Sequence, residues 1–244
     1  MIDIHTHILP GLDDGARDWA QSLKMARAAA NDGICRLIAT PHSYAERGFY
    51  ECFPDEIRSA VKEFQKRLEA AQIPLRVYQG MEVYLNEESL DYLGRGWLLP
   101  LASSDCLLCE FAGEDIPTMT ERLENVAKLG YRPLVAHAER YRALWKSGSP
   151  ILEWKRKGWY LQINASSLTR EPHGFRERYS VMGRESRAAW AMLQADAVFS
   201  VASDCHDLHY RPPCISDARK MVETRLGGAC ADKLFLENPA SLLS

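Results

Sequence analysis

The sequence predicts an α/β protein whose parallel strands close into a TIM-like barrel of about seven strands. Short apolar, β-branched runs alternate with helical patterns along the chain, as expected for repeated β–α units. Seven such runs are present, which favours a closed barrel over an open sheet. Acidic or imidazole side chains stand at the ends of most of these runs. Parallel barrels form their active sites at the carboxyl ends of their strands.

The predicted elements follow one another in a regular order. Gly33 and Gly130 follow two of the helices, and Pro117 opens the helix that ends before Gly130. The polar stretch 165–183 is predicted to form a long loop at one face of the barrel. The strands are expected at 2–5, 34–40, 75–83, 105–111, 132–137, 159–164 and 197–203. The helices are expected at 18–32, 54–71, 117–129, 139–146, 184–195 and 213–226.

Length and composition limit the class of protein. The 244 residues, 46% apolar and 26% charged, are typical of a soluble globular protein. They suffice for one α/β barrel or two small domains. No linker, repeat or low-complexity tract interrupts the chain, so we expect a single domain over residues 1–244. A net charge of -3 argues against a general polyanion binder and leaves room for a local basic pocket.

We expect a cytoplasmic protein that does not insert into a membrane. The chain has no uncharged apolar run long enough for a transmembrane helix. A basic and then apolar N-terminal signal is also missing, and the first expected strand starts at residue 2. The seven cysteines are odd in number and lack a repeated spacing, which indicates reduced cytosolic thiols.

Nine side chains form a candidate metal site near the ends of the expected strands. His5 and His7 share a face because they are two residues apart, and the same spacing joins Asp204 and His206. Asp14 lies in a Gly-rich loop that can fold back over the barrel mouth. The nine candidates are His5, His7, Asp14, His42, Glu82, Glu110, His137, Asp204 and His206.

This set exceeds what one ion needs, so we expect two or three ions bridged by Glu82 and Glu110. Imidazole mixed with carboxylate favours manganese, iron or zinc over calcium or magnesium, and cobalt also fits. Three divalent ions would exceed the charge of four carboxylates, which suits a phosphate dianion. A histidine pair or a strand-end glutamate alone is often structural or solvated, but the ordered set favours a metal site. His173 and His209 match no strand end and are interpreted as loop residues.

Two arginines are candidates for binding an anionic substrate. Arg140 and Arg211 follow His137 and His206 closely, and both can present a forked guanidinium to phosphate oxygens. Surface solvation is the alternative, and it fits Arg211 better than Arg140. Aromatic residues after the second strand can flank an aromatic leaving group or can simply pack the loop. They are Tyr44, Phe49 and Tyr50.

Cysteine chemistry is a competing interpretation that we reject. Residues 52–58 and 205–211 both match the Cys-x5-Arg spacing of cysteine-dependent tyrosine phosphatases. Such a loop must surround phosphate with backbone N–H groups. The first segment contains a proline and two acids, and the second lacks glycine and overlaps the metal candidates. Cys106 and Cys109 form a C-x-x-C motif inside a strand, where alternation sends their side chains to opposite faces.

The motifs together resemble a known family. IDIHTHILPGLDDGARD, TPH, GMEVY, LLCEF, AHAERY, QINASSL and SDCHDLHYRPP are similar to segments of the PHP-superfamily bacterial protein-tyrosine phosphatases of the CpsB/YwqE type. The similarity runs from residue 2 to Asn238-Pro239. It implies the PHP fold, which is a distorted seven-stranded TIM-like barrel, together with a trinuclear centre often associated with manganese and no catalytic cysteine. The family often has TPHH and AHPER, whereas this chain has Ser43 and Ala138.

The resemblance also implies a role for each candidate. Arg140 and Arg211 would bind the substrate phosphate. The implied ligand groups are His5, His7, Glu82 and Asp204 for one ion, Glu82, Glu110 and His137 for a second, and Asp14, His42 and His206 for a third.

The predicted function is metal-dependent hydrolysis of phosphotyrosine. The resemblance implies a tyrosine-autophosphorylated kinase of capsular or exopolysaccharide synthesis as the substrate. The main alternative is a phosphatase for small metabolites, of the histidinol-phosphatase type. A non-catalytic regulator that binds the kinase is disfavoured because the complete ligand set is present. Nucleic-acid cleavage is disfavoured by the acidic balance and the lack of a basic track.

Overall fold

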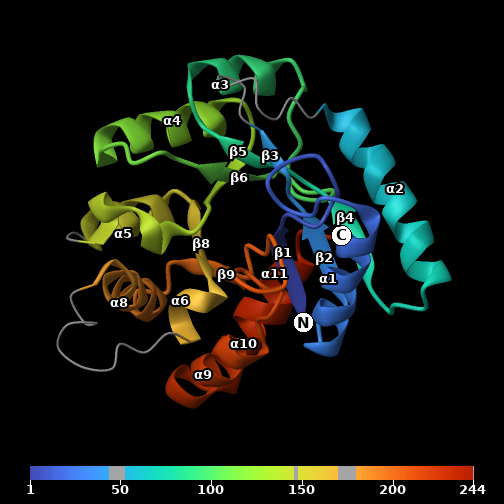
Figure 1. Ribbon diagram of the computed structural model, residues 1–244. Helices are drawn as coiled ribbons and strands as arrows, with labels where there is room; N and C mark the ends of the chain where they lie inside the picture. The colour runs from blue at the N-terminus through green and yellow to red at the C-terminus, as the bar shows by residue number, and fades with distance from the viewer. Residues whose placement is uncertain (44–52, 146–147, 170–179, 244) are drawn as a thin grey trace.

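The computed structural model describes residues 1–43, 53–145, 148–169 and 180–243. Within these ranges the strands form a central ring and the helices pack around it (Figure 1). The predicted α/β barrel is confirmed. None of the described helices is both long enough and apolar enough to span a bilayer.

Seven strand positions make up the ring in the described part of the chain. Two positions are split, because β2 is followed after Pro41 by β3, and β4 is followed by β5. Proline has no backbone N–H and therefore interrupts the strand ladder. The strands are β1 Ile2–Thr6, β2 Arg36–Ala39, β3 His42–Ser43, β4 Arg76–Gln79, β5 Glu82–Tyr84, β6 Cys106–Glu110, β7 Arg132–Val135, β8 Tyr160–Asn164 and β9 Val198–Ala202.

All of the strand pairs are parallel, so their carboxyl ends meet at one side of the barrel. The order is β1–β2–β4 in one sheet and β3–β5–β6–β7–β8–β9 in the other. The ring closes between β9 and β1. There His7 N–H donates to Cys205 O at 2.9 Å, and Asp204 N–H donates to His5 O at 3.0 Å. This closure places the first candidate ligands, His5 and His7, next to the last ones, Asp204 and His206.

The helices follow the strands in the expected alternation. Side chains of Asp18 and Asp115 accept backbone N–H groups at the starts of α1 and α4, at 2.8 and 3.0 Å. The helices are α1 Trp19–Asn31, α2 Pro54–Ala70, α3 Glu87–Gly94, α4 Ile116–Lys128, α5 Gly148–Arg156, α6 Ala165–Thr169, α8 Val181–Gln194, α9 Ser216–Leu226, α10 Gly228–Asp232 and α11 Asn238–Ala240. Single turns complete the set, namely η1 Ala138–Arg140, η2 Arg142–Trp145 and η3 Lys233–Glu237.

Three regions differ from the sequence prediction. Residues 139–146 were expected to form one helix, but the described part forms the separate 3-10 turns η1 and η2, because Tyr141 between them is extended. The expected loop 165–183 begins with α6 and ends in α8, and residues 170–179 lie outside the described residues. The helices α3, α5, α10 and α11 were not predicted.

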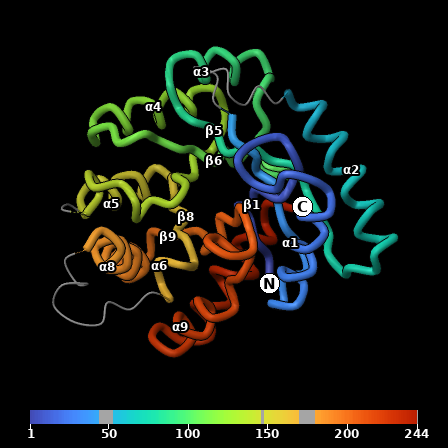
Figure 2. The backbone as a smooth tube through the Cα atoms, in the orientation of Figure 1, coloured from blue at the N-terminus to red at the C-terminus, as the bar shows by residue number. Residues whose placement is uncertain are grey.

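The core has two layers that meet at the strands. On β6, Leu107 and Cys109 join the large cluster between strands and helices, whereas Cys106 and Leu108 join a smaller cluster. The predicted opposite orientation of the two cysteines is therefore confirmed. The C-terminal segment returns to the barrel (Figure 2), where α11 contacts β1 and β9 and Leu242 joins the smaller cluster. The buried side chain of Leu242 therefore packs with strand residues of the barrel.

Candidate metal centre

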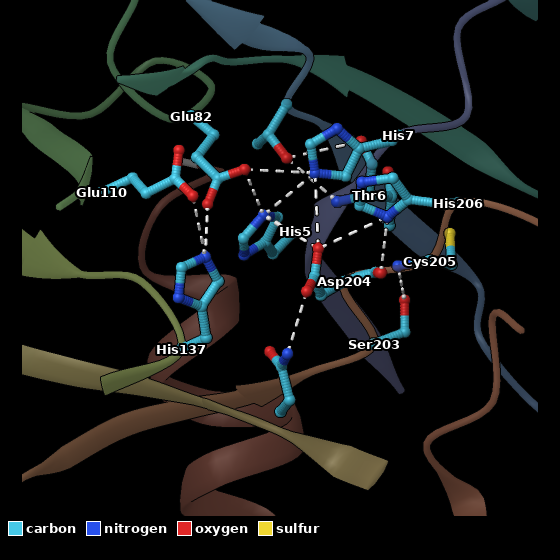
Figure 3. Close-up of polar contacts among 12 residues, drawn as sticks. His5, Thr6, His7, Glu82, Glu110, His137, Ser203, Asp204, Cys205 and His206 are labelled. Atoms are coloured by element: carbon cyan, nitrogen blue, oxygen red, sulfur yellow. Dashed lines mark hydrogen bonds and ion pairs between the residues drawn. The ribbon is translucent and has the colours of Figure 1, made fainter. Parts of the chain in front are cut away.

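The candidate metal ligands meet at the carboxyl ends of the strands. Figure 3 shows His5, His7, Glu82, His137 and Asp204 pointing toward one another from different parts of the barrel. Most of the nine predicted side chains are buried, and Glu110 and Asp14 are the more exposed members. Three overlapping groups bring ligand atoms within 4.8 Å of one another: His5, His7, Glu82 and Asp204; His42, Glu82 and Glu110; His7, Asp14, His42 and His206.

Glu82 is the centre of the first group. Its Oε2 atom lies 3.1 Å from His5 Nε2, 3.2 Å from His7 Nε2 and 3.0 Å from His42 Nδ1. Asp204 Oδ1 completes the group at 3.6 Å from His5 Nε2 and 3.4 Å from His7 Nε2. Five ligand atoms from four strand positions thus converge on one small volume.

The second group extends from Glu82 toward Glu110. His137 Nε2 lies 2.8 Å from Glu82 Oε1 and 3.7 Å from Glu110 Oε1, so it contacts both carboxylates. His42 Nδ1 lies 3.7 Å from Glu110 Oε2. The resemblance implied His137 for this ion, whereas the group whose ligand atoms all lie within 4.8 Å of one another contains His42. Both histidines lie within reach of the same carboxylate pair.

The third group depends on the loop after β1. Asp14 Oδ1 lies 3.2 Å from His206 Nε2 and 3.5 Å from His42 Nε2. The loop folds back because Ala16 N–H donates to His7 O at 3.0 Å. A β-carbon at Gly15 would collide with that same carbonyl, so only glycine permits this approach.

Two of the candidate ligands have unusual backbone conformations. His137 has φ of 31° and Asp204 has φ of 53°, in the left-handed region that non-glycine residues seldom adopt. Such strain costs on the order of 1–3 kcal/mol and is concentrated at functional sites. His137 lies two residues after the end of β7, and Asp204 lies two residues after the end of β9. At each of these positions the turn aims the side chain into the centre.

Charge within the centre is strongly coupled. Burial disfavours the ionised form of Glu82, but His5 and His42 outweigh burial and hold its pKa well below the usual range. Burial likewise opposes charge on His5, yet Glu82 and Asp204 raise the pKa of His5 to about 9. In the metal-free protein, Glu82 is therefore ionised and helps to hold a proton on His5 that a metal would displace.

The residues fit divalent metal ions. Nε2 atoms of His5 and His7 lie only 3.2 Å apart. Glu82 Oε2 is buried and forms ion-pair contacts but no hydrogen bond to the described residues. Imidazoles and carboxylates that share one centre are the donor set of manganese, iron and zinc sites. Several cations would satisfy these converging lone pairs.

Two arginines stand at the rim of the centre. Arg140 Nη1 donates to Asp204 Oδ2 at 3.4 Å, and Arg211 Nη2 lies 3.5 Å from Asp14 Oδ2. Their side chains are 45% and 40% exposed, so each guanidinium touches the ligand set and also faces solvent. A pocket of about 430 Å³ adjoins this rim and is lined by Glu110, His137 and Arg140 among others.

Comparisons with known proteins agree with this geometry. A family model described as capsular polysaccharide synthesis, CpsB/CapC, matches residues 1–244. The chain belongs to the CpsB/CapC family. Tyrosine-protein phosphatase YwqE of Bacillus subtilis is 35% identical over 229 residues, which cover 93% of this chain and 85% of the relative. Tyrosine-protein phosphatase CpsB of Streptococcus agalactiae serotype V is 34% identical over 251 residues, which cover 100% of this chain and 98% of the relative.

A solved structure extends the comparison to three dimensions. It belongs to a study of YwqE from Bacillus subtilis and CpsB from Streptococcus pneumoniae, described there as unique metal-dependent tyrosine phosphatases. The match has a TM-score of 0.87 and 34% identity, and it covers 100% of this chain and 94% of the other. The shared CpsB/CapC fold therefore includes the whole barrel.

Asp13 is a site residue that sequence reasoning missed in this CpsB/CapC chain. Its Oδ2 atom lies 2.7 Å from His7 Nδ1 and accepts the His42 N–H at 3.1 Å, while Oδ1 accepts the Gly15 N–H at 2.9 Å. The adjacent acids Asp13 and Asp14 were a usable signal, because a loop that brings one of them to the centre brings the other close to it.

Two buried cysteines of this family member, Cys106 and Cys205, have thiols that are unsuited to nucleophilic catalysis. Cys205 is fully buried, and burial raises the pKa of its thiol to about 12. Burial likewise raises the pKa of Cys106 to about 12. A reactive thiol needs a lowered pKa and exposure, so neither fits a nucleophile.

The remaining residues named in the sequence analysis are the loop histidines, the aromatic residues after the second strand and Cys52. His209 is exposed in the turn after His206, as expected for a loop histidine. Other residues lie outside the described part of the chain, and they are Tyr44, Phe49, Tyr50, Cys52 and His173.

Proposed function

We propose that this chain is a metal-dependent protein-tyrosine phosphatase. The observation that carries the proposal is the convergence of nine imidazole and carboxylate side chains, eight in the three groups and His137 beside Glu82, next to two half-exposed arginines. A metal centre alone supports many hydrolases. The addition of two guanidinium groups at its rim favours an anionic phosphate ester over a neutral substrate.

The residues have distinct roles in this mechanism. His5, His7, Asp14, His42, Glu82, Glu110, His137, Asp204 and His206 would hold the ions. When bound, divalent ions polarise phosphoryl oxygens and lower the pKa of water. Arg140 and Arg211 bind the phosphate oxygens from the solvent side and stabilise the charge that develops on them during in-line displacement. Their contacts to Asp204 and Asp14 keep both guanidinium groups aimed at the centre before substrate arrives.

Phosphotyrosine suits a site of this kind better than phosphoserine. A phenol has a pKa of about 10, far below that of an aliphatic alcohol, so its oxygen leaves more readily. Charge stabilisation at phosphorus can then suffice without a dedicated proton donor. The pocket beside Arg140 gives the aromatic ring a place next to the centre.

The proposed substrate is a tyrosine-phosphorylated kinase of capsular or exopolysaccharide synthesis, and the proposed metal is manganese. The family description, capsular polysaccharide synthesis, supports the first assignment. The mixed imidazole and carboxylate donors support the second, with iron, cobalt or zinc as substitutes.

The test is phosphate release from a phosphotyrosine peptide. A phosphoserine peptide of the same sequence and histidinol phosphate serve as parallel substrates, each with Mn²⁺ and with chelator. We expect chelator-sensitive release that favours the phosphotyrosine peptide by at least about tenfold, because the leaving groups differ in pKa. Preference for histidinol phosphate would move the function to small-molecule metabolism.

Matched variants test the residues. Glu110→Gln and His42→Ala should each remove most of the phosphate release, since each removes a metal ligand. Glu124→Gln, a change at a surface ion pair with Lys157, should retain it. Turnover near that of the unmodified protein in Glu110→Gln would contradict the assignment of the metal centre.

A further inference from the structure

Two buried amides on β8 connect ligands of the metal centre without belonging to it. Gln162 and Asn164 are two residues apart and are 0% and 6% exposed. Their hydrogen bonds run from His5 at one end to Asp204 at the other. Both of those residues belong to the same candidate metal group. This chain of four side chains is called the amide relay below.

The direction of the amide relay is fixed by one backbone group. His137 N–H donates to Gln162 Oε1 at 2.9 Å. A backbone N–H can only donate, so this atom of the Gln162 amide must be the oxygen. The same oxygen lies 2.9 Å from His5 Nδ1. Nδ1 of His5 must therefore carry a hydrogen, so that in the neutral imidazole the lone pair on Nε2 faces the metal group.

The second half of the relay orients a carboxylate. With its oxygen assigned, Gln162 donates through Nε2 to Asn164 Oδ1 at 2.9 Å. Asn164 must then present its amide nitrogen to Asp204, and Nδ2 donates to Asp204 Oδ2 at 2.9 Å. This bond occupies Oδ2 and leaves Oδ1 to face the imidazoles of His5 and His7.

The surroundings hold the relay in place. Asn164 N–H donates to Oε1 of Glu139 at 3.0 Å, which ties the end of β8 to the turn that carries Arg140. A buried polar chain with both ends satisfied is rigid, because breaking any bond leaves a desolvated group without a partner.

We propose that Gln162 and Asn164 are positioning residues of the metal centre. Through the amide relay they set the tautomer of His5 and the orientation of Asp204. The inference rests on the metal centre of the proposed function and is independent of its substrate. Partners that orient metal ligands typically change metal affinity by about 10–100-fold when they are removed.

Metal affinity and tautomer, rather than activity, test this proposal. Zn²⁺ binding to the full-length protein is measured by competition with a chromophoric chelator. Gln162→Met and Asn164→Leu should each weaken the binding of at least one ion by about 10–100-fold. Gln79→Met, the same change on β4 away from the ligand groups, should bind Zn²⁺ as the unmodified protein does. Thermal unfolding of each chelator-treated variant shows whether it is folded.

A double-mutant cycle separates a relay from two unrelated packing defects. If the two amides act as one unit, the double variant loses little more affinity than either single variant. If the fold-losses of Zn²⁺ affinity in the two single variants multiply in the double variant, the proposal is overturned. Single variants that bind Zn²⁺ normally would also overturn it. Failure of the unmodified protein to bind Zn²⁺ would instead contradict the metal centre itself.

Histidine nitrogen spectra supply a direct readout. In the zinc-loaded protein, a two-bond proton–nitrogen correlation should show His5 protonated at Nδ1. Gln162→Glu retains an acceptor for this proton and should keep the signal, whereas Gln162→Met should lose or shift it. A His5 that is protonated at Nε2 in the zinc-loaded protein would contradict the amide relay.

Discussion

Asp13 and His7 form a carboxylate–imidazole pair, in which His7 Nδ1 lies 2.7 Å from Asp13 Oδ2. Asp13 opposes the burial penalty on His7 and raises the pKa of that histidine well above its usual value. The pair keeps hydrogen on Nδ1 and directs Nε2 toward Glu82, at 3.2 Å. Asp13 therefore orients a candidate ligand from behind.

Replacement of Asp13 with asparagine should weaken metal binding. The amide accepts a hydrogen bond less strongly than a carboxylate, so His7 is held less firmly. We expect Zn²⁺ affinity to fall by about 10–100-fold. Chelator competition measures the affinity. Asp18→Asn is the matched control, because asparagine caps α1 as well as aspartate does. Equal affinities in the two variants would contradict the role of Asp13.

Replacement of Arg140 with lysine should impair turnover but leave metal content unchanged. Lysine keeps the charge and loses the planar fork that binds two phosphate oxygens. We expect kcat/KM for a phosphotyrosine peptide to fall by about 10–100-fold, or about 1.4–2.8 kcal/mol. Arg95→Lys, at an exposed ion pair with Asp91, is the control. A loss of bound metal in Arg140→Lys would show that this arginine supports the centre instead.

Metal affinity should depend steeply on pH. The pKa of His5 is raised to about 9 in the metal-free protein, so His5 holds a proton throughout the neutral range. Only the neutral imidazole binds a metal, and binding below that pKa must expel the proton. Affinity for Mn²⁺ should therefore rise between about pH 6 and 8, by about tenfold per unit for each proton expelled. Calorimetry in buffers that differ in their heat of protonation gives the number of protons released when Mn²⁺ binds. An affinity that does not change with pH would refute the expectation.

Cys205→Ala should retain turnover. The Cys205 thiol is buried and its pKa is raised to about 12, so it contributes no thiolate at neutral pH. We expect kcat within about threefold of the unmodified protein, since losing one buried sulfur changes local packing only slightly. Metal content is measured on the same samples. Abolished turnover with normal metal content would restore the Cys-x5-Arg interpretation.

Much of the barrel could be predicted from the sequence, because the signals for strands and helices are local. Every predicted strand range overlaps an observed strand, with boundaries shifted by a few residues at most, and only the short β3 lies outside the predicted ranges among the described strands. Gly33 and Gly130 follow α1 and α4 with φ of 89° each, as their positions predicted. The helix α3 was missed because it is short. The C-terminal turns were missed because their burial depends on contacts with β1 and β9 rather than on periodicity.

The candidate site was predictable for a different reason. Strand ends in a parallel barrel meet at one face, so His5 and Asp204 can be placed together although 199 positions separate them. The assignment of individual ligands to individual ions remains a prediction. His137 and His42 both contact the carboxylate pair Glu82 and Glu110, and spacing in the chain cannot rank them.

By itself the sequence determined the succession of strands along the chain, the chemistry of the donors and their common location, because periodicity and strand ends are local properties. Only the tertiary structure decided which groups orient those donors. Gln162 and Asn164 have ordinary polar side chains whose hydrogen-bond partners cannot be read from the sequence, and Asp13 could be noticed there only as the neighbour of Asp14. Their roles arise from hydrogen bonds of 2.7–2.9 Å to residues brought near by barrel closure. The direction of such bonds depends on three-dimensional contacts, such as that between His137 N–H and Gln162.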